Sequence, residues 1–128
     1  MEKDKKRKIT HRSAKNKGKK LQNWVAQQIS NLLGIPCEKD GDIESRQMGM
    51  SGVDVILRGE AAELFKYDIE CKNCESWSVP GWIKQAKANQ RKGRDWLLFA
   101  TKNRFDKIVI MDADAFFKLY EKLLQKKV

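Results

Sequence analysis

Apolar residues recur three and four positions apart in three stretches of the chain, which is the spacing of one face of a helix. The first spans 21–33 and is followed by Gly34 and Pro36, which favour a helix end. The second lies within 79–93, and the third, 112–124, begins with aspartates that can cap a helix. The stripe positions are Leu21, Trp24, Val25, Gln28, Ile29, Leu32 and Leu33; Trp82, Ile83 and Ala86; and Phe116, Phe117, Tyr120, Leu123 and Leu124. The pattern predicts three helices.

Four shorter stretches have the composition or alternation of strands. They are residues 53–57, 65–72, 96–101 and 107–111. An extra strand before Met48 fits the same pattern. The order of helix, two strands, helix, two strands and helix predicts an α/β fold with a mixed central sheet of four to five strands, flanked by helices.

Basic residues are concentrated at the start of the chain. The 128 residues carry a net charge of +10, and the first twenty hold ten basic and two acidic side chains. A stretch of this kind repels itself and cannot bury apolar area, so we expect 1–16 to be a flexible basic arm that seeks phosphate. A chain of this length can bury one modest core, and we expect 17–128 to form one folded domain.

The apolar runs and the cysteines indicate the cellular compartment in which we expect the protein. No stretch approaches eighteen consecutive apolar residues, and no apolar segment follows the charged start, so neither a membrane span nor a signal peptide is expected. Cys71 and Cys74 form a CKNC motif, but zinc requires four ligands and only Cys37 and His11 remain. We therefore expect an intracellular protein with free thiols.

The strand over 65–72 has charged side chains in its middle. Successive strand residues point to opposite faces, so Glu70 and Lys72 project together. Asp54 begins the preceding strand and lies near Glu70 if the two strands pair. Two carboxylates that close are unfavourable unless a cation lies between them, and oxygen ligands select Mg²⁺ or Mn²⁺.

Lys72 beside such a cation could help to deprotonate a water molecule and stabilise charge on a phosphate. The alternative is a solvated strand face on which Glu70 and Lys72 form an ion pair of little energetic value. Asp54, Glu70 and Lys72 all interrupt apolar segments in a chain whose basic excess indicates phosphate, and this combination favours the metal site.

These residues resemble the signature of the PD-(D/E)XK nuclease superfamily, an aspartate on one strand and Glu-x-Lys on the next. The stretch "RQMGMSGVDV" is similar to archaeal-type Holliday junction resolvases, and "ECKN", with Gln85, Ala86 and Asn89 on the next helix, is similar to small phage-encoded nucleases. The resemblance covers about 17–112. It implies a restriction-endonuclease-like core in which Asp54, Glu70 and the main-chain carbonyl of Cys71 bind the metal and Lys72 is catalytic.

One feature departs from the resolvases, which usually carry a metal-binding glutamate on the first helix. No acid lies between Asp4 and Glu38 here. Gln22 is the nearest substitute, although it adds no charge, and Glu44 is a second candidate for the missing ligand.

Several further residues are candidates for contact with substrate. Gln85 and Asn89 lie four apart on one helical face, where they could contact a water on the metal or a phosphate, or form a plain polar surface. The DNA-binding candidates are Arg46, Gln47, Ser51, Gly52 and Gly49 of the glycine loop, with Lys17, Lys19, Lys20 and Asn89. Trp24, Trp82, Trp96 and Phe99 are predicted core residues, whereas Trp77 either wedges against a junction or caps the core.

The resemblance implies a Mg²⁺-dependent (or Mn²⁺-dependent) DNA endonuclease that acts by in-line water attack and leaves 5′-phosphate and 3′-hydroxyl ends. The expected substrate is branched DNA, especially four-way junctions, and the expected state is a homodimer in the cytoplasm of a prokaryote or a virus-infected host. Two alternatives remain open, a phage nuclease acting on other DNA forms and a non-catalytic basic nucleic-acid-binding module.

Overall fold

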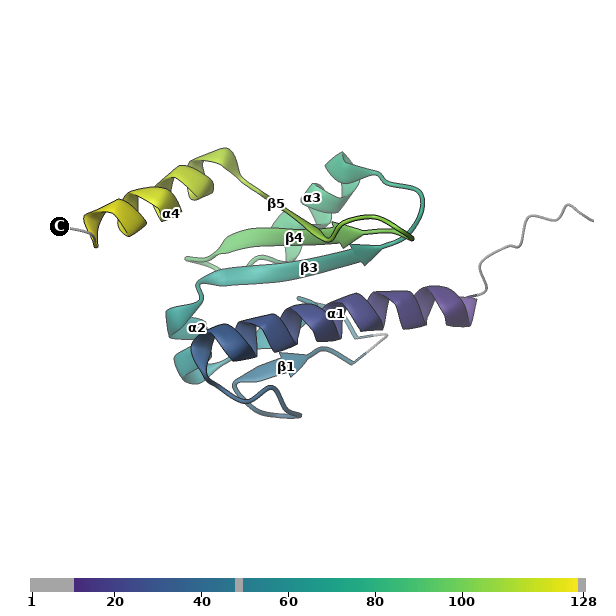
Figure 1. Ribbon diagram of the computed structural model, residues 1–128, viewed down its shortest axis with the longest axis horizontal. Helices are drawn as coiled ribbons and strands as arrows, with labels where there is room; N and C mark the ends of the chain where they lie inside the picture. The colour runs from purple at the N-terminus through teal and green to yellow at the C-terminus, as the bar shows by residue number, and fades with distance from the viewer. Residues whose placement is uncertain (1–10, 48–49, 127–128) are drawn as a thin grey trace, which may run out of the picture.

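The computed structural model describes residues 11–47 and 50–126, which form a five-stranded sheet with helices on both faces. The strand order is β1-β2-β3-β4-β5, with β3 and β4 parallel and the other neighbours antiparallel (Figure 1). The elements are α1 (His11–Leu33), β1 (Ile43–Ser45), β2 (Val55–Leu57), α2 (Gly59–Leu64), β3 (Tyr67–Asn73), α3 (Val79–Asn89), β4 (Asp95–Thr101), β5 (Ile108–Met111) and α4 (Ala113–Gln125). The predicted α/β fold with its mixed sheet, including the extra strand before Met48, is confirmed.

Helix α1 covers one face of the sheet. Its buried Leu21, Val25 and Ile29 belong to one hydrophobic cluster with Val55 and Ile69 of the strands. The helix begins at His11, ten residues before the apolar stripe that predicted it. The boundary drawn after residue 16 therefore falls within α1.

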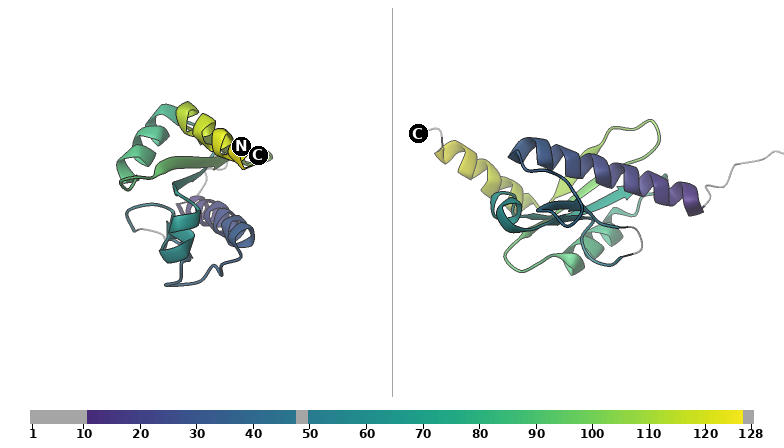
Figure 2. Two further views of the ribbon diagram at one scale, coloured as in Figure 1. Left: turned by 90° about the vertical axis from the view of Figure 1, so that its left-hand side faces the viewer. Right: turned by 90° about the horizontal axis from the view of Figure 1, so that it is seen from below.

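Helix α3 covers the opposite face (Figure 2). Trp82 and Ala86 pack with Trp96, Leu98 and Ala100, which form the second hydrophobic cluster. The predicted helix over 79–93 ends at Asn89, because Gln90 has an extended backbone.

The aromatic residues divide between core and surface. Trp82 and Trp96 are buried and Phe99 is half-buried against the first cluster, as predicted. Trp77 packs at 5.6 Å from the ring of Trp82 and joins the second cluster, as the core-capping alternative expects. Trp24 differs from the prediction, because its position at the edge of the α1 stripe leaves it 40% exposed.

Helices α2 and α4 differ most from expectation. The six-residue α2 was not predicted, because it buries only Ala61 and is too short for a periodic signal. Asp112 caps α4 as predicted, accepting a hydrogen bond from the Ala115 backbone N at 3.2 Å. Helix α4 then extends beyond the sheet with only Ala115 buried, so its predicted apolar face is exposed (Figure 1). Across the described ranges, no helix has the length and apolar character needed to cross a membrane.

Candidate active site

The pairing between the backbones of β2 and β3 ends where the predicted catalytic residues lie. Within the described chain they share one residue pair, Val55 with Ile69, and the Asp54 backbone N donates to the Ile69 carbonyl at 2.9 Å. Two residues further along β3, the Cys71 backbone N donates to the Asp54 side-chain Oδ2 at 2.7 Å. The carboxylate of Asp54 thus takes the place of a strand partner and is fixed against β3.

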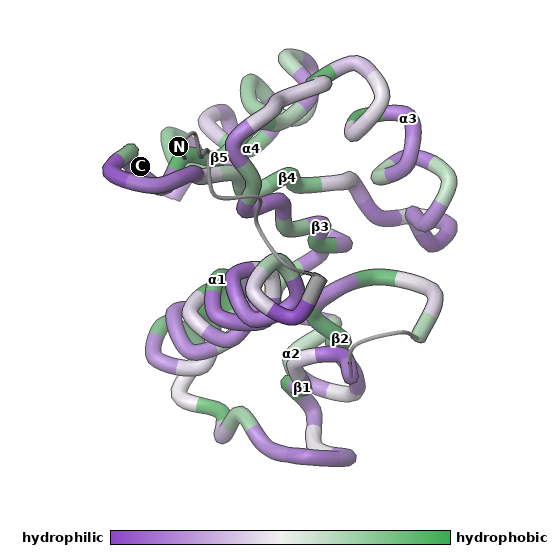
Figure 3. Tube along the Cα trace, turned by 90° about the vertical axis from the view of Figure 1, so that its right-hand side faces the viewer, coloured by the Kyte–Doolittle hydropathy of each residue, from purple (hydrophilic) through white to green (hydrophobic). Residues whose placement is uncertain are grey.

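The sheet register places Asp54 beside Glu70. Val55 and Ile69 are directly paired and both join the cluster under α1, so Glu70, the next residue of β3, points to the α3 face. Asp54 directly precedes β2, and its negative charge acts on Glu70. Both carboxylates are buried, with exposures of 7% and 2%. Lys72 follows Glu70 by two residues and shares its face. Figure 3 shows the alternation of hydrophilic and hydrophobic residues along β3. The structure therefore brings together the three residues that the sequence singled out.

The two carboxylates differ in their surroundings. Burial, and after it the negative charge of Asp54, raises the pKa of Glu70 from its ordinary value of 4.5 to about 7. Asp54 is instead paired with Arg46, whose Nη2 lies 2.6 Å from Asp54 Oδ1. The Arg46 Nε donates to the Val53 carbonyl at 2.7 Å, while its buried Nη1 has no acceptor among the described residues. Arg46 thus serves as the internal counter-ion of Asp54 and retains an unused donor.

Helix α3 supplies two amide side chains to the same site. The Lys72 Nζ donates to Gln85 Oε1 at 2.8 Å. The Asn89 Nδ2 lies 3.4 Å from Glu70 Oε1 and 3.4 Å from the Gly52 carbonyl, linking the carboxylate to the glycine loop. The helical face that carries Gln85 and Asn89 is therefore directed at the catalytic residues.

The two candidates for a third acidic ligand each contact other residues, and Gln22 reaches Arg46, the partner of Asp54. Gln22 is buried on the α1 side, where its Nε2 donates to Ser45 Oγ at 2.8 Å and also to the Arg46 carbonyl. Glu44 forms an ion pair with Arg58 at 2.9 Å, and the hydrogen bond from Arg58 lowers the pKa of Glu44. The structure records no contact of either side chain with Asp54 or Glu70.

The donor set fits a hard divalent cation. Within a strand the N–H and C=O of one residue point to the same edge, so the Cys71 carbonyl lies on the edge that faces Asp54. Two carboxylates and a carbonyl offer only oxygen, which suits Mg²⁺ or Mn²⁺. Among the described residues there is no group of three or more histidine, cysteine or acidic side chains that could hold a metal.

The cysteines are free thiols that occupy separate places. Cys71 packs against the cluster under α1, and Cys74 packs against the cluster under α3. Burial raises the pKa of Cys71 well above its ordinary value of 9.0, so this thiol is protonated at neutral pH.

The predicted DNA-binding residues surround the site unevenly. Gln47, Ser51 and Lys20 are exposed, whereas Gly49 lies outside the described residues. Gly52 has a φ of 107°, a left-handed conformation that favours glycine. Lys17 is paired with Glu75 at 3.1 Å, and Lys19 donates to the Arg46 carbonyl at 2.9 Å. These last two lysines also hold the amino-terminal half of α1 against the sheet.

Sequence reasoning missed an ionic cluster around the buried Asp68, beside the site. Asp68 lies on the same face of β3 as Glu70 and accepts hydrogen bonds from Arg91 (Nη2, 2.7 Å; backbone N, 2.6 Å) and from Arg94 (Nε, 2.9 Å). Two features of the sequence could have indicated this cluster. Asp68 precedes Glu70 by two residues and so lies on the same strand face, and two arginines follow the helix that ends at Asn89. The cluster fixes the end of α3, and therefore Asn89, against the catalytic strand.

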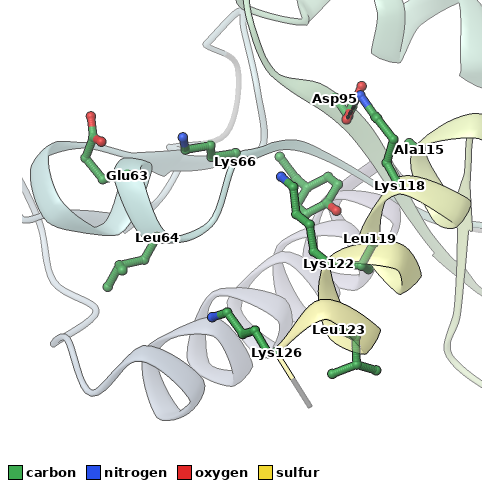
Figure 4. A pocket seen from close by; sticks show the side chains of 11 residues that line it. Glu63, Leu64, Lys66, Asp95, Ala115, Lys118, Leu119, Lys122, Leu123 and Lys126 are labelled. Atoms are coloured by element: carbon green, nitrogen blue, oxygen red, sulfur yellow. Dashed lines mark ion pairs between the residues drawn. The ribbon is translucent and has the colours of Figure 1, made fainter. Parts of the chain in front are cut away.

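The cavity beneath α4 lies at the other end of β3. It has a volume of about 380 Å³ and is formed by α2, the start of β3 and α4 (Figure 4). Lys118 of α4 lies beside Asp95 there, at 3.5 Å. Neither Asp54, Glu70 nor Lys72 lines this cavity, so the chemistry is not placed there.

Comparison with known proteins agrees with this geometry. A family model described as "Phage putative PDDEXK endonuclease" matches residues 13–128. Searches of curated proteins and of solved structures found no match. The family match extends over nearly the whole chain and includes Asp54, Glu70 and Lys72, which the fold brings together at the central strand of the sheet. The chain belongs to this family of phage PD-(D/E)XK endonucleases.

Proposed function

We propose that this protein is a Mg²⁺-dependent endonuclease that hydrolyses phosphodiester bonds in DNA. The observation that carries the proposal is the convergence of two buried carboxylates, Asp54 and Glu70, with Lys72 on the same strand face. Asp54, Glu70 and the Cys71 carbonyl would hold the cation. When bound, it would act as a Lewis acid on the phosphate and stabilise the negative charge that develops in the transition state.

Lys72 would act on the reacting phosphate, and Gln85 would orient Lys72. The Lys72 ammonium donates to Gln85 Oε1, which fixes its direction, and its charge acts on the neighbouring Glu70. From that position it can donate to a phosphate oxygen as negative charge builds up there. In-line attack with loss of the 3′ oxygen would leave 5′-phosphate and 3′-hydroxyl ends.

Arg46 would contribute to substrate binding. Its buried Nη1 has no acceptor among the described residues, and a buried donor of that kind favours an incoming acceptor such as a phosphate oxygen. Gln47 and Ser51, which follow Arg46 on the exposed loop, offer further donors to the same backbone.

The favoured substrate is branched DNA, with four-way junctions first, and the favoured state is a homodimer. The similarity of "RQMGMSGVDV" to junction resolvases and the lysines of α1 support the substrate. The exposed apolar face of α4 supports a second copy of the chain, because large exposed apolar patches mark protein interfaces. Other DNA forms, and a basic module without catalytic activity, are the competing functions.

The experiment is a cleavage panel of labelled junction, flap, duplex and single-stranded DNA, with Mg²⁺ and with chelator. We expect Asp54→Asn and Glu70→Gln to lose cleavage while retaining DNA binding, since each removes a metal ligand and leaves the basic surface. Asp114→Asn, an exposed acid on α4, is the matched control and should cleave as the wild type does. Cleavage that persists in either active-site variant, or in chelator, would exclude the proposed mechanism.

A further inference from the structure

A basic cavity lies on the α1 side of the molecule, between α1 and the loop that joins β4 to β5. Its volume is about 550 Å³. Five basic side chains line it, against one acid, Asp106. The five are Lys17, Lys20, Lys102, Arg104 and Lys107. This balance favours a polyanion as the occupant.

Two aromatic rings line the same cavity. Trp24 of α1 is 40% exposed and Phe105 of the loop is 46% exposed. The Lys107 Nζ lies 5.1 Å from the centroid of the Trp24 ring, and the Lys102 Nζ lies 5.2 Å from that of Phe105. Each ring is thus accompanied by a cation within the range of a cation–π contact. A wall that alternates aromatic rings with cations is typical of surfaces that stack bases and hold the phosphates between them.

The cavity adjoins the catalytic strand from the other side. Asn73 lines it and directly follows Lys72 on β3. The Asn73 Nδ2 donates to the Lys17 carbonyl at 3.0 Å, which connects the strand end to α1. Because successive strand residues face opposite sides, Lys72 points to the α3 face and Asn73 to the α1 face. A strand in the cavity would therefore pass the same end of β3 as the strand being cut.

We propose that this cavity binds a single strand of DNA, with Trp24 and Phe105 stacking on unpaired bases. The proposal rests on the proposed function, because it assigns the occupant to the unpaired part of a branched substrate. Single-stranded rather than duplex DNA follows from the rings. Bases in a duplex are stacked on one another, so only an unpaired strand exposes base faces to two side chains on a cavity wall.

The test measures the affinity of the full-length protein for a fluorescein-labelled dT12 by anisotropy, in chelator so that no DNA is cut. We expect Trp24→Ala and Phe105→Ala each to raise the Kd about tenfold, because each substitution removes the stacking of one base on an aromatic side chain. The affinity of the same variants for a 12-base-pair duplex should fall by less than about threefold. Leu64→Ala, at an exposed apolar side chain of α2, is the control and should bind dT12 as the wild type does.

The second readout locates the contact directly. Photo-crosslinking with a dT12 that carries one 5-iodouracil should modify the peptides that contain Trp24 or Phe105. Phe105 lies in a loop outside α1, so its variant keeps the test informative if Trp24→Ala weakens that helix. Because the Phe105 ring also packs at 5.4 Å from that of Trp77 in the second hydrophobic cluster, circular dichroism checks that each variant is folded. The proposal is overturned if both alanine variants bind dT12 as tightly as the wild type, or if duplex and dT12 lose affinity equally. Tighter binding of U12 by tenfold or more would also overturn it, in favour of RNA.

The two proposals fail separately. If the protein cleaves none of the DNA panel but its affinity for dT12 depends on Trp24 and Phe105, the endonuclease proposal falls and the single-strand site stands. If it cleaves DNA and its affinity for dT12 is insensitive to both substitutions, the site falls and the endonuclease proposal stands.

Discussion

Asp68 and Glu70 share one face of β3, yet their surroundings differ sharply. Burial opposes ionisation of Asp68, but the hydrogen bonds from Arg91 and Arg94 outweigh it and lower the pKa of Asp68. Glu70 has one long contact, from Asn89 at 3.4 Å, and its pKa rises to about 7. In the absence of metal, Asp68 is therefore ionised at neutral pH, and Glu70 is about half protonated.

The first prediction concerns the pH dependence of stability in chelator. Glu70 has a pKa of about 7 in the folded state and an ordinary value of 4.5, so the folded state binds more protons between these values. Its favourable contribution is complete below pH 4.5 and is lost as the pH rises to 7. As the pH rises from 5 to 8, the free energy of unfolding of Glu70→Gln should therefore increase relative to that of the wild type, by at most about 3 kcal/mol.

Urea unfolding of both proteins at the two pH values measures this difference, and Glu121→Gln, an exposed substitution on α4, serves as the control. A difference between Glu70→Gln and the wild type that stays constant with pH would contradict the burial of a titrating carboxyl group at this position.

Lys72 and Gln85 provide the second prediction. Lys72→Ala should lower the turnover rate at saturating DNA by about two orders of magnitude, because a donor at the reacting phosphate is removed. Gln85→Ala should lower it by about tenfold, since it only directs the ammonium. Stopped-time cleavage assays measure both, with Lys84→Ala on the exposed part of α3 as control. A Lys72→Ala rate within threefold of the wild type would make Lys72 a surface residue.

At the residue scale, the sequence predicted the alignment of Glu70 with Lys72 but not the ion pairs that arginines form with Asp54 and Asp68. Alternation along 65–72 was sufficient to align Glu70 with Lys72, because a strand has a fixed period. The pairing of Arg46 with Asp54 depends on how β1 and β2 meet, and the partners of Asp68 lie 23 and 26 residues away in the chain. Contacts of that separation are set by packing rather than by local pattern.

The elements are joined at the site by the segment that follows α3. Arg94 donates to the carbonyls of Ala62 at 2.8 Å and of Phe65 at 2.6 Å, in addition to Asp68. Arg91 Nη1 donates to the carbonyl of Leu57 at 3.1 Å. One short turn therefore connects α3 to β2, to α2 and to the catalytic strand, and it sets where Asn89 lies.

The third prediction follows from this connection. Asp68→Asn should lower the free energy of unfolding by up to about 3–5 kcal/mol, since it leaves the largely buried Arg94 guanidinium, 11% exposed, without its anion. Asp114→Asn, in the first turn of α4, is the control for loss of one carboxylate and should change stability by less than about 1 kcal/mol. Denaturant unfolding measures both stabilities. Equal stabilities for the two variants would show that the ion pairs of Asp68 do not stabilise the fold.

Most elements were predictable because their burial pattern is periodic. The stripe over 21–33 locates the buried half of α1, whereas residues 11–20 form helix without an apolar stripe and are held partly by Lys17 and Lys19. Helix α2 is fixed by its place between strands rather than by its own pattern. Local periodicity therefore specifies buried elements and leaves surface extensions undetermined.

At the scale of the whole molecule, helix α4 presents a large apolar surface that the described part of the fold does not cover. The large apolar residues of α4 are 45% to 68% exposed, whereas Ala115 is buried and Lys118 forms an ion pair with Asp95 of β4. The apolar face is formed by Phe116, Phe117, Leu119, Tyr120, Leu123 and Leu124. A surface of this kind is expected to be buried when the proposed homodimer forms.

The fourth prediction is that the protein is a dimer of twice its 14.9 kDa chain mass and that Phe117→Lys combined with Leu124→Lys makes it a monomer. Light scattering after gel filtration measures both masses. Leu32→Lys, at a leucine of α1 that is 71% exposed, is the matched control and should remain dimeric. A wild-type mass of one chain, or a double variant that stays dimeric, would remove α4 from the interface.

The unequal treatment of Asp68 and Glu70 also determines how this gene would respond to selection. A library screened only for folded expression should retain Asp68, Arg91 and Arg94 and drift at Glu70 toward neutral side chains, because an uncompensated buried acid costs stability. A library screened for phage fitness should retain both acids. The two screens would separate the residues that maintain the scaffold from those kept for the reaction, without any assay of the purified protein.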